Sequence, residues 1–134
     1  MISYVVPVFD EEESLEAFYK ELIRAADRFG DSYEIVFVDD GSRDKTLELL
    51  KELSRKDNKI KIYSFQRNHG KAEALTYGFQ KAKGEIIVTL DADLQDRPDE
   101  IAKLLEKQKE GYDLVNGWRK NRKDTFLKKI FSLL

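Results

Sequence analysis

The residues best suited to chemistry stand near the middle of the chain, where an apolar run ends in polar side chains. Ile86 to Leu90 is followed by Asp91, Asp93 and Gln95. In extended backbone, residues two apart point to the same side, so these three side chains can direct oxygen atoms toward one place. Such oxygens are ligands of hard cations such as Mg²⁺ or Mn²⁺. The stretch predicts either a divalent metal site or a simple turn whose aspartates cap a helix led by Pro98.

The elements that must position these side chains follow from hydrophobic periodicity. Strands are predicted over residues 2–8, 33–38, 60–65, 86–90 and 114–116, and helices over 15–30, around 47–53, over 72–82 and over 98–111. The first helix is expected to use Asp10 as its cap. Strands that are apolar on both faces and alternate with helices predict a doubly wound α/β domain, with a mostly parallel sheet and helices on both faces.

The composition sets limits on the possible functions. The 134 residues, 41% of them hydrophobic and 37% charged, are enough for one domain with one sizeable core. A net charge of −2 gives no reason to expect a nucleic-acid partner. The absence of cysteine excludes disulfides, thiolate zinc sites and a cysteine nucleophile. The sequence as given has neither a signal peptide nor a run of about 18–20 apolar residues, so a cytoplasmic location is expected.

Unusual polar residues follow four of the predicted strands. Right-handed crossovers place the carboxyl ends of parallel strands at one edge of the sheet, where ligands of such folds bind. Carboxylates gathered there repel one another unless a cation or hydrogen-bond donors compensate them. The sequence therefore predicts a binding site at this edge, built from residues 10–11, 39–40, 66–68, 91 and 93.

Four motifs in register carry a family resemblance. They are Val6–Glu11, Val38–Asp44, Asn68–Lys71 and Asp91–Pro98. In this order and spacing they resemble the family 2 glycosyltransferases of GT-A fold, over essentially the whole chain. The ending Asp-Leu-Gln-Asp-x-Pro and the later stretch Gly117–Asp124 are similar to the polyisoprenyl-phosphate glycosyltransferases, a group that includes dolichol-phosphate mannosyltransferase.

The resemblance implies a metal-dependent, inverting hexosyltransferase that moves a sugar from a UDP- or GDP-sugar to a polyisoprenyl phosphate of the cell envelope. Residues 1–118 are then a Rossmann-like nucleotide-sugar-binding core. Residues 119–134 are a basic acceptor loop and the start of an amphipathic interfacial helix. Because relatives continue beyond this point, an incomplete catalytic domain is expected. The alternative is a non-catalytic domain that binds nucleotide or membrane on the same scaffold. A third possibility, a flavodoxin-like phosphoacceptor domain, would need a lysine at the end of its last strand. It is disfavoured because the last predicted strand ends in Asn116–Gly117.

The donor site is predicted from residue chemistry and the resemblance together. Phe9 offers an apolar surface to a base or ribose, and Glu11 is either a hydrogen-bond acceptor or a helix cap. The resemblance assigns Asp40 to the base. Gly70 and Lys71, at the start of a helix, suit a phosphate oxygen, although a solvated lysine is the alternative. The donor-binding residues predicted in this way are Pro7, Phe9, Glu11, Asp40, Gly70, Lys71, Asp91 and Ala92.

The resemblance also assigns roles to the polar side chains that follow the strand 86–90. Asp93 and Gln95 are the predicted ligands of Mg²⁺ or Mn²⁺, and Asp91 is a donor contact with metal contact as its second possibility. Among the other polar residues, Asp44 is predicted to cap the second helix. The single histidine, His69, is either a turn residue with peripheral contacts or a general base.

A basic segment stands near the end of the sequence. It is expected to bind the acceptor phosphate and anionic lipid headgroups; the alternative is a solvated loop. The predicted catalytic residues are Arg119 and Arg122 of this segment, together with Asp91 and Asp93. The apolar residues that follow predict a helix lying at the bilayer interface, on the inner face of a membrane. The basic residues are Arg119, Lys120, Arg122, Lys123, Lys128 and Lys129.

Overall fold

A five-stranded parallel sheet forms the centre of the protein. The computed structural model describes residues 1–93, 103, 106 and 129–132. The strand order is β3-β2-β1-β4-β5, and every pair of neighbours is parallel. The strands are β1 (Ile2–Val8), β2 (Tyr33–Asp39), β3 (Ile60–Ser64), β4 (Ile86–Thr89) and β5 (Lys129–Ser132). The predicted doubly wound α/β fold is confirmed.

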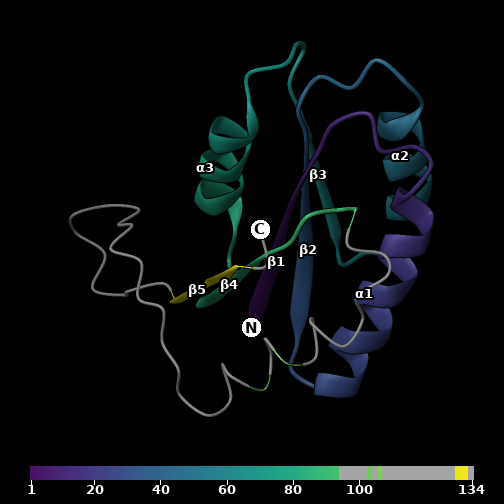
Figure 1. The fold of residues 1–134 in the computed structure, drawn as a ribbon. Helices are drawn as coiled ribbons and strands as arrows, with labels where there is room; N and C mark the ends of the chain where they lie inside the picture. Colours follow the sequence, from purple (N-terminus) through teal and green to yellow (C-terminus); the bar gives the residue numbers. More distant parts are fainter. Residues whose placement is uncertain (94–102, 104–105, 107–128, 133–134) are drawn as a thin grey trace.

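Among the described residues, three helices cover the two faces of this sheet (Figure 1). They are α1 (Leu15–Phe29), α2 (Thr46–Lys56) and α3 (Lys71–Lys81). On one face, α1 and α2 bury residues such as Phe18 and Leu50 against the sheet, and on the other α3 buries Ala74 against Val5 and Val38. All seven residues of β1 and of β2 are buried, as expected for strands that are packed on both faces.

The start of α1 differs from the sequence-based expectation. Ser14 occupies the N-cap position, and its hydroxyl donates to Oε2 of Glu11 at 2.8 Å. Asp10 is therefore not the cap. It adopts a φ of 51°, and its carboxylate accepts hydrogen bonds from Arg43 in the next loop of the sheet edge. The predicted end of α1 is confirmed, because Gly30 has a φ of 93° and donates its N–H to the carbonyl of Ala26.

Only some of the elements predicted for the later part of the chain fall on described residues. The predicted strand 114–116 lies outside the described residues, and of the predicted helix 98–111 only Lys103 and Glu106 are described, both helical. The interfacial helix predicted near the end is wrong over Lys129–Ser132, which pairs with β4 as a strand. Ile and Phe favour strands, and this pairing satisfies backbone groups along the edge of β4. No helix of the described residues is long and apolar enough to cross a membrane.

Candidate functional site

A cavity of about 250 Å³ opens at the carboxyl ends of the central strands. Its walls come from three places: the loop after β1, the end of β2 with the start of α3, and the turn after β4. The lining residues are Pro7, Val8, Phe9, Glu11, Asp40, Lys71, Asp91 and Asp93. All except Val8 are residues that the sequence predicts for the site, so the fold brings them together as expected.

The remaining predicted site residues do not line the cavity or cannot be placed. Gly70 lies next to the cavity and donates its N–H to Oδ2 of Asp40 at 3.0 Å. Ala92, within the turn after β4, is fully buried. Gln95, Arg119 and Arg122 lie outside the described residues, so their roles stay predictions.

Negative charge dominates the cavity. Burial raises the pKa of Glu11, and the charges of Asp93 and Asp91 raise it further, while the hydrogen bond from the Ser14 hydroxyl opposes them. One positive charge offsets this group, since Nζ of Lys71 lies 3.0 Å from Oδ2 of Asp91. A cation placed among these carboxylates would relieve their mutual repulsion.

The carboxylates fit a divalent ion that shares its coordination with a ligand. Asp91 and Asp93 both line the cavity, and hard cations prefer such oxygens. Within the part of the chain that the structure describes, no group of three or more His, Cys, Asp or Glu side chains is arranged to hold a metal. Mg²⁺ commonly takes one or two protein carboxylates besides phosphate and water, so the pair is adequate when a phosphate is present.

The loop between β1 and α1 is fastened to the loop between β2 and α2 by side chains of which the sequence analysis singled out only Asp44. Three successive backbone N–H groups of the first loop donate to side chains of the second loop and of the first residue of α2. These bonds are Asp10 N to Ser42 Oγ (2.9 Å), Glu11 N to Thr46 Oγ1 (2.8 Å) and Glu12 N to Asp44 Oδ2 (3.2 Å). Asp44 is not the N-cap predicted for the second helix, because Lys45 occupies that position, but its carboxylate accepts the backbone N–H of Thr46, the first residue of α2, at 2.8 Å.

Arg43 strengthens the same connection and packs over the ring of Phe9, a residue that lines the cavity. Its Nη2 and Nε lie 2.8 and 3.2 Å from Oδ2 of Asp10, and its guanidinium lies 5.3 Å from the centre of the Phe9 ring. The Arg43 side chain lowers the pKa of Asp10. Phe9, the predicted surface for a base or ribose, is thus held between a fixed loop and a cationic plane. Only the loop conformation reveals this role of Arg43.

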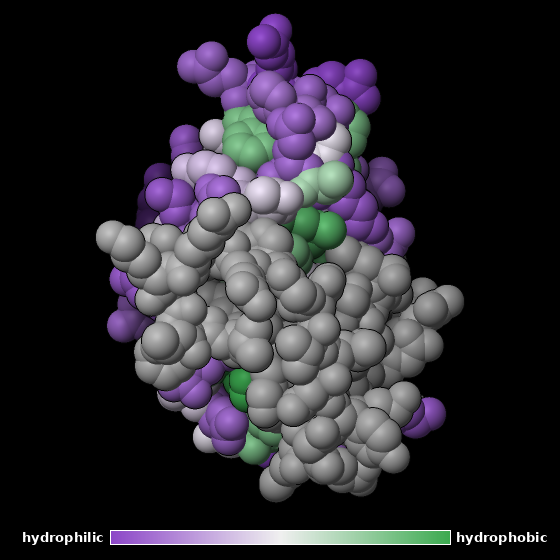
Figure 2. Space-filling view, turned by 90° about the vertical axis from the view of Figure 1, so that its left-hand side faces the viewer, coloured by the Kyte–Doolittle hydropathy of each residue, from purple (hydrophilic) through white to green (hydrophobic). Residues whose placement is uncertain are grey.

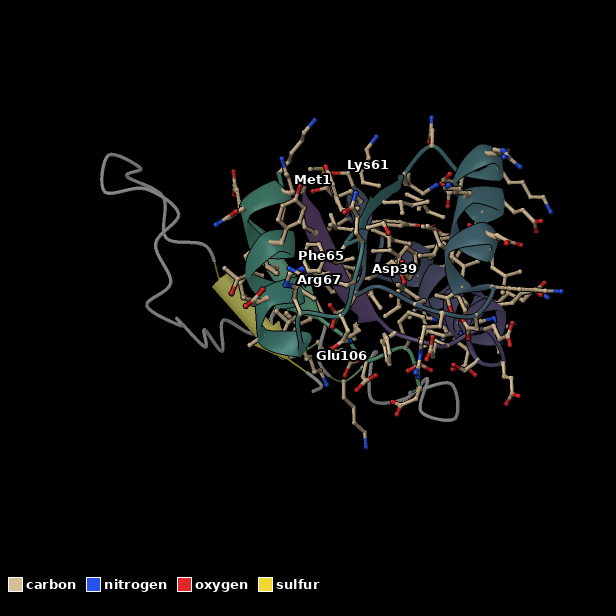
Figure 3. The ribbon with its side chains drawn as sticks, turned by 90° about the horizontal axis from the view of Figure 1, so that it is seen from above. Met1, Asp39, Lys61, Phe65, Arg67 and Glu106 are labelled. Carbon is tan, nitrogen blue, oxygen red and sulfur yellow. The ribbon has the colours of Figure 1, made fainter. Side chains whose placement is uncertain are left out.

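A second connection joins the end of β2 to the loop between β3 and α3. The carboxylate of Asp40 accepts hydrogen bonds from residues 68–70 of that loop, and Gly41 lies directly against its backbone. Figure 3, which looks down on this edge, shows Asp39 between α3 and α2, with Phe65 and Arg67 beside α3. The loops that follow β1, β2 and β3 therefore form one connected rim around the cavity.

His69 is not among the residues that line this cavity. Its ring packs edge-on against Phe65, with 5.2 Å between ring centres, and its Nδ1 lies 3.4 Å from Oε2 of Glu73. It lines a separate, aromatic cavity of about 410 Å³ beside α3. These contacts match the peripheral role that sequence analysis considered and place the side chain outside the residues that line the predicted site.

Figure 2 shows that the upper end of the α3 side is mainly hydrophilic, with small apolar patches.

Comparison with known sequences identifies a family of similar chains. A sequence profile described as Glycosyl transferase family 2 matches residues 3–132. The chain is 39% identical over 135 residues to an undecaprenyl-phosphate 4-deoxy-4-formamido-L-arabinose transferase of Aeromonas hydrophila. The aligned region covers 100% of this chain and 41% of the relative. It is 45% identical over 128 residues to the uncharacterized glycosyltransferase YkcC of Bacillus subtilis, and this alignment covers 95% of this chain and 40% of YkcC. The chain spans about two fifths of the length of these relatives.

Solved structures share the fold. The mannosyltransferase PcManGT from Pyrobaculum calidifontis, in complex with GDP-Man and Mn²⁺, superposes with a TM-score of 0.57 at 27% identity, over 69% of this chain and 27% of that one. TarS 1–349 of S. aureus, in complex with UDP-GlcNAc, gives a TM-score of 0.59 at 23% identity, over 79% and 31%. The second likeness shows the fold alone.

Proposed function

The chain belongs to glycosyltransferase family 2, and we propose that it takes part in moving a sugar from a nucleoside-diphosphate donor to a polyisoprenyl phosphate, with inversion and with a divalent metal. The observation that carries this proposal is the cavity at the strand ends, which gathers an aromatic ring, a lysine and several carboxylates. An aromatic surface suits a base or ribose, and a cation suits a diphosphate. The acceptor class is supported by the names of the undecaprenyl-phosphate transferases that the chain resembles.

Each part of the donor has a matching part of the cavity. The wall formed by Phe9, Glu11 and Asp40 faces the base and ribose, and the donor is a UDP-sugar or a GDP-sugar. Lys71 lies where it can contact a phosphate oxygen, and Asp91 contacts the donor on its sugar side. A Mg²⁺ or Mn²⁺ ion would be held by Asp93, with Gln95 as the predicted second ligand, and would supply positive charge near the departing diphosphate.

The transfer needs few groups of the protein. An acceptor phosphate is ionised near neutral pH, so its oxygen attacks the anomeric carbon without a general base, and the bond to the diphosphate breaks on the opposite side. The protein therefore acts by orienting the two substrates and by balancing charge. This is consistent with His69, the one histidine, lining the separate cavity beside α3. Arg119 and Arg122 are the proposed contacts of the acceptor phosphate.

The basic segment from Arg119 to Lys129 is the proposed contact with the membrane surface. A cluster of Lys and Arg is attracted to anionic headgroups, where each contributes about 1 kcal/mol. We expect the protein to sediment with vesicles that contain an anionic phospholipid and not with phosphatidylcholine vesicles. Sedimentation with neither would contradict peripheral association at the inner face of a membrane.

Calorimetry with free nucleotides tests the donor site most directly. We expect UDP or GDP to bind in the presence of Mn²⁺ or Mg²⁺, and to bind at least about tenfold more weakly when EDTA replaces the metal. The matching nucleoside without phosphates serves as control, because it lacks the groups that Lys71 and the metal contact. A folded protein that binds neither nucleotide under either condition would contradict the proposal.

A further inference from the structure

The cavity of about 410 Å³ beside α3 is separate from the proposed donor site. Its volume falls within the range of about 300–1,000 Å³ that small-molecule sites occupy. Two of its lining side chains are half-buried aromatic rings, Phe65 and Tyr77, and the others are polar and exposed. The polar ones are His69, Glu73, Thr76 and Gln80. None of these side chains lines the cavity at the strand ends, so the two cavities share no lining residue.

The aromatic rings at this cavity restrain one another. Tyr77 of α3 meets Phe65 edge-on, with 5.5 Å between ring centres and 78° between ring planes. It meets Tyr63 of β3 in the same way, at 5.5 Å and 70°. Phe65 in turn meets His69 at 5.2 Å and 86°, and Figure 3 shows Phe65 beside α3. Because edge-to-face pairs are favourable, the rings lose little further freedom when a ligand contacts them.

The charges at the cavity disfavour an ionic ligand. No Lys or Arg is among the residues that line it, so an anion finds no fixed positive charge there. The position for a cation is already taken, because Nζ of Lys81 lies 5.5 Å from the ring centre of Tyr63 and 5.4 Å from that of Tyr77. A second cation beside these rings would be repelled by Lys81. Glu73 would attract it only weakly, since its side chain is 66% exposed.

The polar side chains disfavour a wholly apolar ligand as well. Thr76 donates its hydroxyl proton to the carbonyl of Ala72 at 2.9 Å, which leaves the oxygen able to accept. The carboxylate of Glu73 is an acceptor, and the amide of Gln80 both donates and accepts. A ligand without hydrogen-bonding groups would displace water from these side chains and replace none of its bonds. The lining therefore favours a neutral molecule that has hydroxyl groups along its edge and C–H groups on a flat face.

From this lining we infer that the cavity beside α3 binds a neutral saccharide, with one face of a pyranose ring against Phe65 and Tyr77 and its hydroxyl groups toward Glu73 and Gln80. The C–H groups on that face carry slight positive charge, which suits the negative face of an aromatic ring. The hydroxyl groups can donate to a carboxylate and exchange hydrogen bonds with an amide. The inference goes beyond the proposed function, because a sugar would bind here without nucleotide and without metal.

Nuclear magnetic resonance of the isotope-labelled protein tests this site, with the methyl glycosides of glucose, galactose and mannose as probes. We expect at least one glycoside to shift the amides of residues 73–80 saturably, with a Kd of about 1–10 mM, when nucleotide and metal are absent. No saturable shift from any of the three up to about 50 mM, or shifts confined to the donor cavity, would overturn the inference.

Two further compounds test the chemistry of the ligand. Glucose 6-phosphate brings an anion, and cyclohexanol has a single hydroxyl group on an apolar ring. Each should bind at least about fivefold more weakly than the best glycoside. Equal binding of glucose 6-phosphate would overturn the assignment to a neutral ligand, and equal binding of cyclohexanol would overturn the assignment to a saccharide.

Substitutions assign the shifts to the cavity. Tyr77→Leu keeps an apolar side chain but removes the ring, and should weaken the glycoside by about tenfold or more. Glu73→Ala, at an exposed position in the first turn of α3, should weaken it by about threefold or more. Glu48→Ala is the matched control, because it removes the same side chain from an exposed position in the first turn of α2, and should leave the affinity unchanged.

Unchanged glycoside affinity in Tyr77→Leu would overturn the inference. If that variant does not fold, the exposed pair Glu73→Ala and Gln80→Ala, combined in one protein, decides in the same way. The result is independent of the donor site. A protein that binds a glycoside beside α3 but neither UDP nor GDP would keep this inference and lose the proposed function. One that binds nucleotide but no glycoside would do the reverse.

Discussion

The ammonium of Lys71 lies 3.0 Å from Oδ2 of Asp91 and joins the first residue of α3 to the end of β4. The lysine side chain is 52% exposed and the aspartate 29%, so the pair adds little to folding stability in water. Its importance lies in placement, because it holds one positive charge inside a group of carboxylates.

Lys71→Met should therefore separate binding from stability. We expect the affinity for UDP or GDP in Mn²⁺ to fall by about tenfold, since a charge-assisted contact with the diphosphate is lost. The melting temperature should change by less than about 2 °C. Lys20→Met removes the same charge from an exposed position on α1 and should leave the affinity unchanged. Equal affinities in Lys71→Met and wild type would show that the lysine is only a solvated side chain.

Asp93→Ala should remove the metal dependence of nucleotide binding. Asp93 is an exposed carboxylate that lines the cavity, so its loss leaves no structural defect and weakens the proposed metal site. We expect the affinity for nucleotide in Mn²⁺ to fall to about the level measured in EDTA. Asp31→Ala, at an exposed position between α1 and β2, controls for the change in net charge. Metal-dependent binding that persists in Asp93→Ala would count against the assigned site.

Glu11 should give stability a dependence on pH. Because burial and the charges of Asp93 and Asp91 raise its pKa, ionising Glu11 costs more in the folded state than in the unfolded state. This penalty is absent at pH values below the ordinary pKa of about 4.3 and is complete once the pH exceeds the raised value. Glu11→Gln should thus raise the melting temperature by about 1–2 °C at pH 7, with the gain vanishing near pH 3.5.

The matched variant is Glu13→Gln, which removes a charge from an exposed position in the same loop. We expect no comparable gain at pH 7. Thermal unfolding followed by circular dichroism at the two pH values measures both variants. A Glu11→Gln protein that is less stable than wild type at pH 7 would mean that the Ser14 hydrogen bond outweighs burial.

Two glycines of positive φ should respond differently to the same substitution. Gly30 has a φ of 93° and open space around the position of a Cβ, so Gly30→Ala should cost only the left-handed backbone conformation, about 1–2 kcal/mol. Gly41 has a φ of 72° and a backbone carbon 2.3 Å from that position, so Gly41→Ala should cost more than about 3 kcal/mol. Urea unfolding measures both. Equal losses would mean that the loop at Arg67 shifts freely.

Much of the fold could be predicted because periodicity reports burial. Leu15, Phe18, Leu22 and Ala26 recur at helical spacing, and all four are buried against the sheet. The membership of the cavity could be predicted for a related reason: strand ends of a parallel sheet meet at one edge whatever the details of the loops.

The contacts within the rim could not be predicted in the same way. Asp39 and Asp40 are the same residue type in adjacent positions, yet only the carboxylate of the second accepts hydrogen bonds from residues 68–70 before α3. Asp10 looked like a helix cap but pairs with Arg43, because its φ of 51° turns the chain toward the next loop. Such pairings join residues about thirty positions apart and depend on loop conformation, which leaves no period in the sequence.

The strand order carries a consequence for biosynthesis. Because the chain emerges amino end first, β1, β2 and β3 and the three connected loops that follow them are all available once Lys71 has left the ribosome. The remaining open side of β1 waits for β4, which begins at Ile86. The wall proposed to receive the base has thus left the ribosome before Asp91 and Asp93 emerge, and a nascent chain halted between these points would expose a nucleoside surface but none of the carboxylates proposed to bind metal.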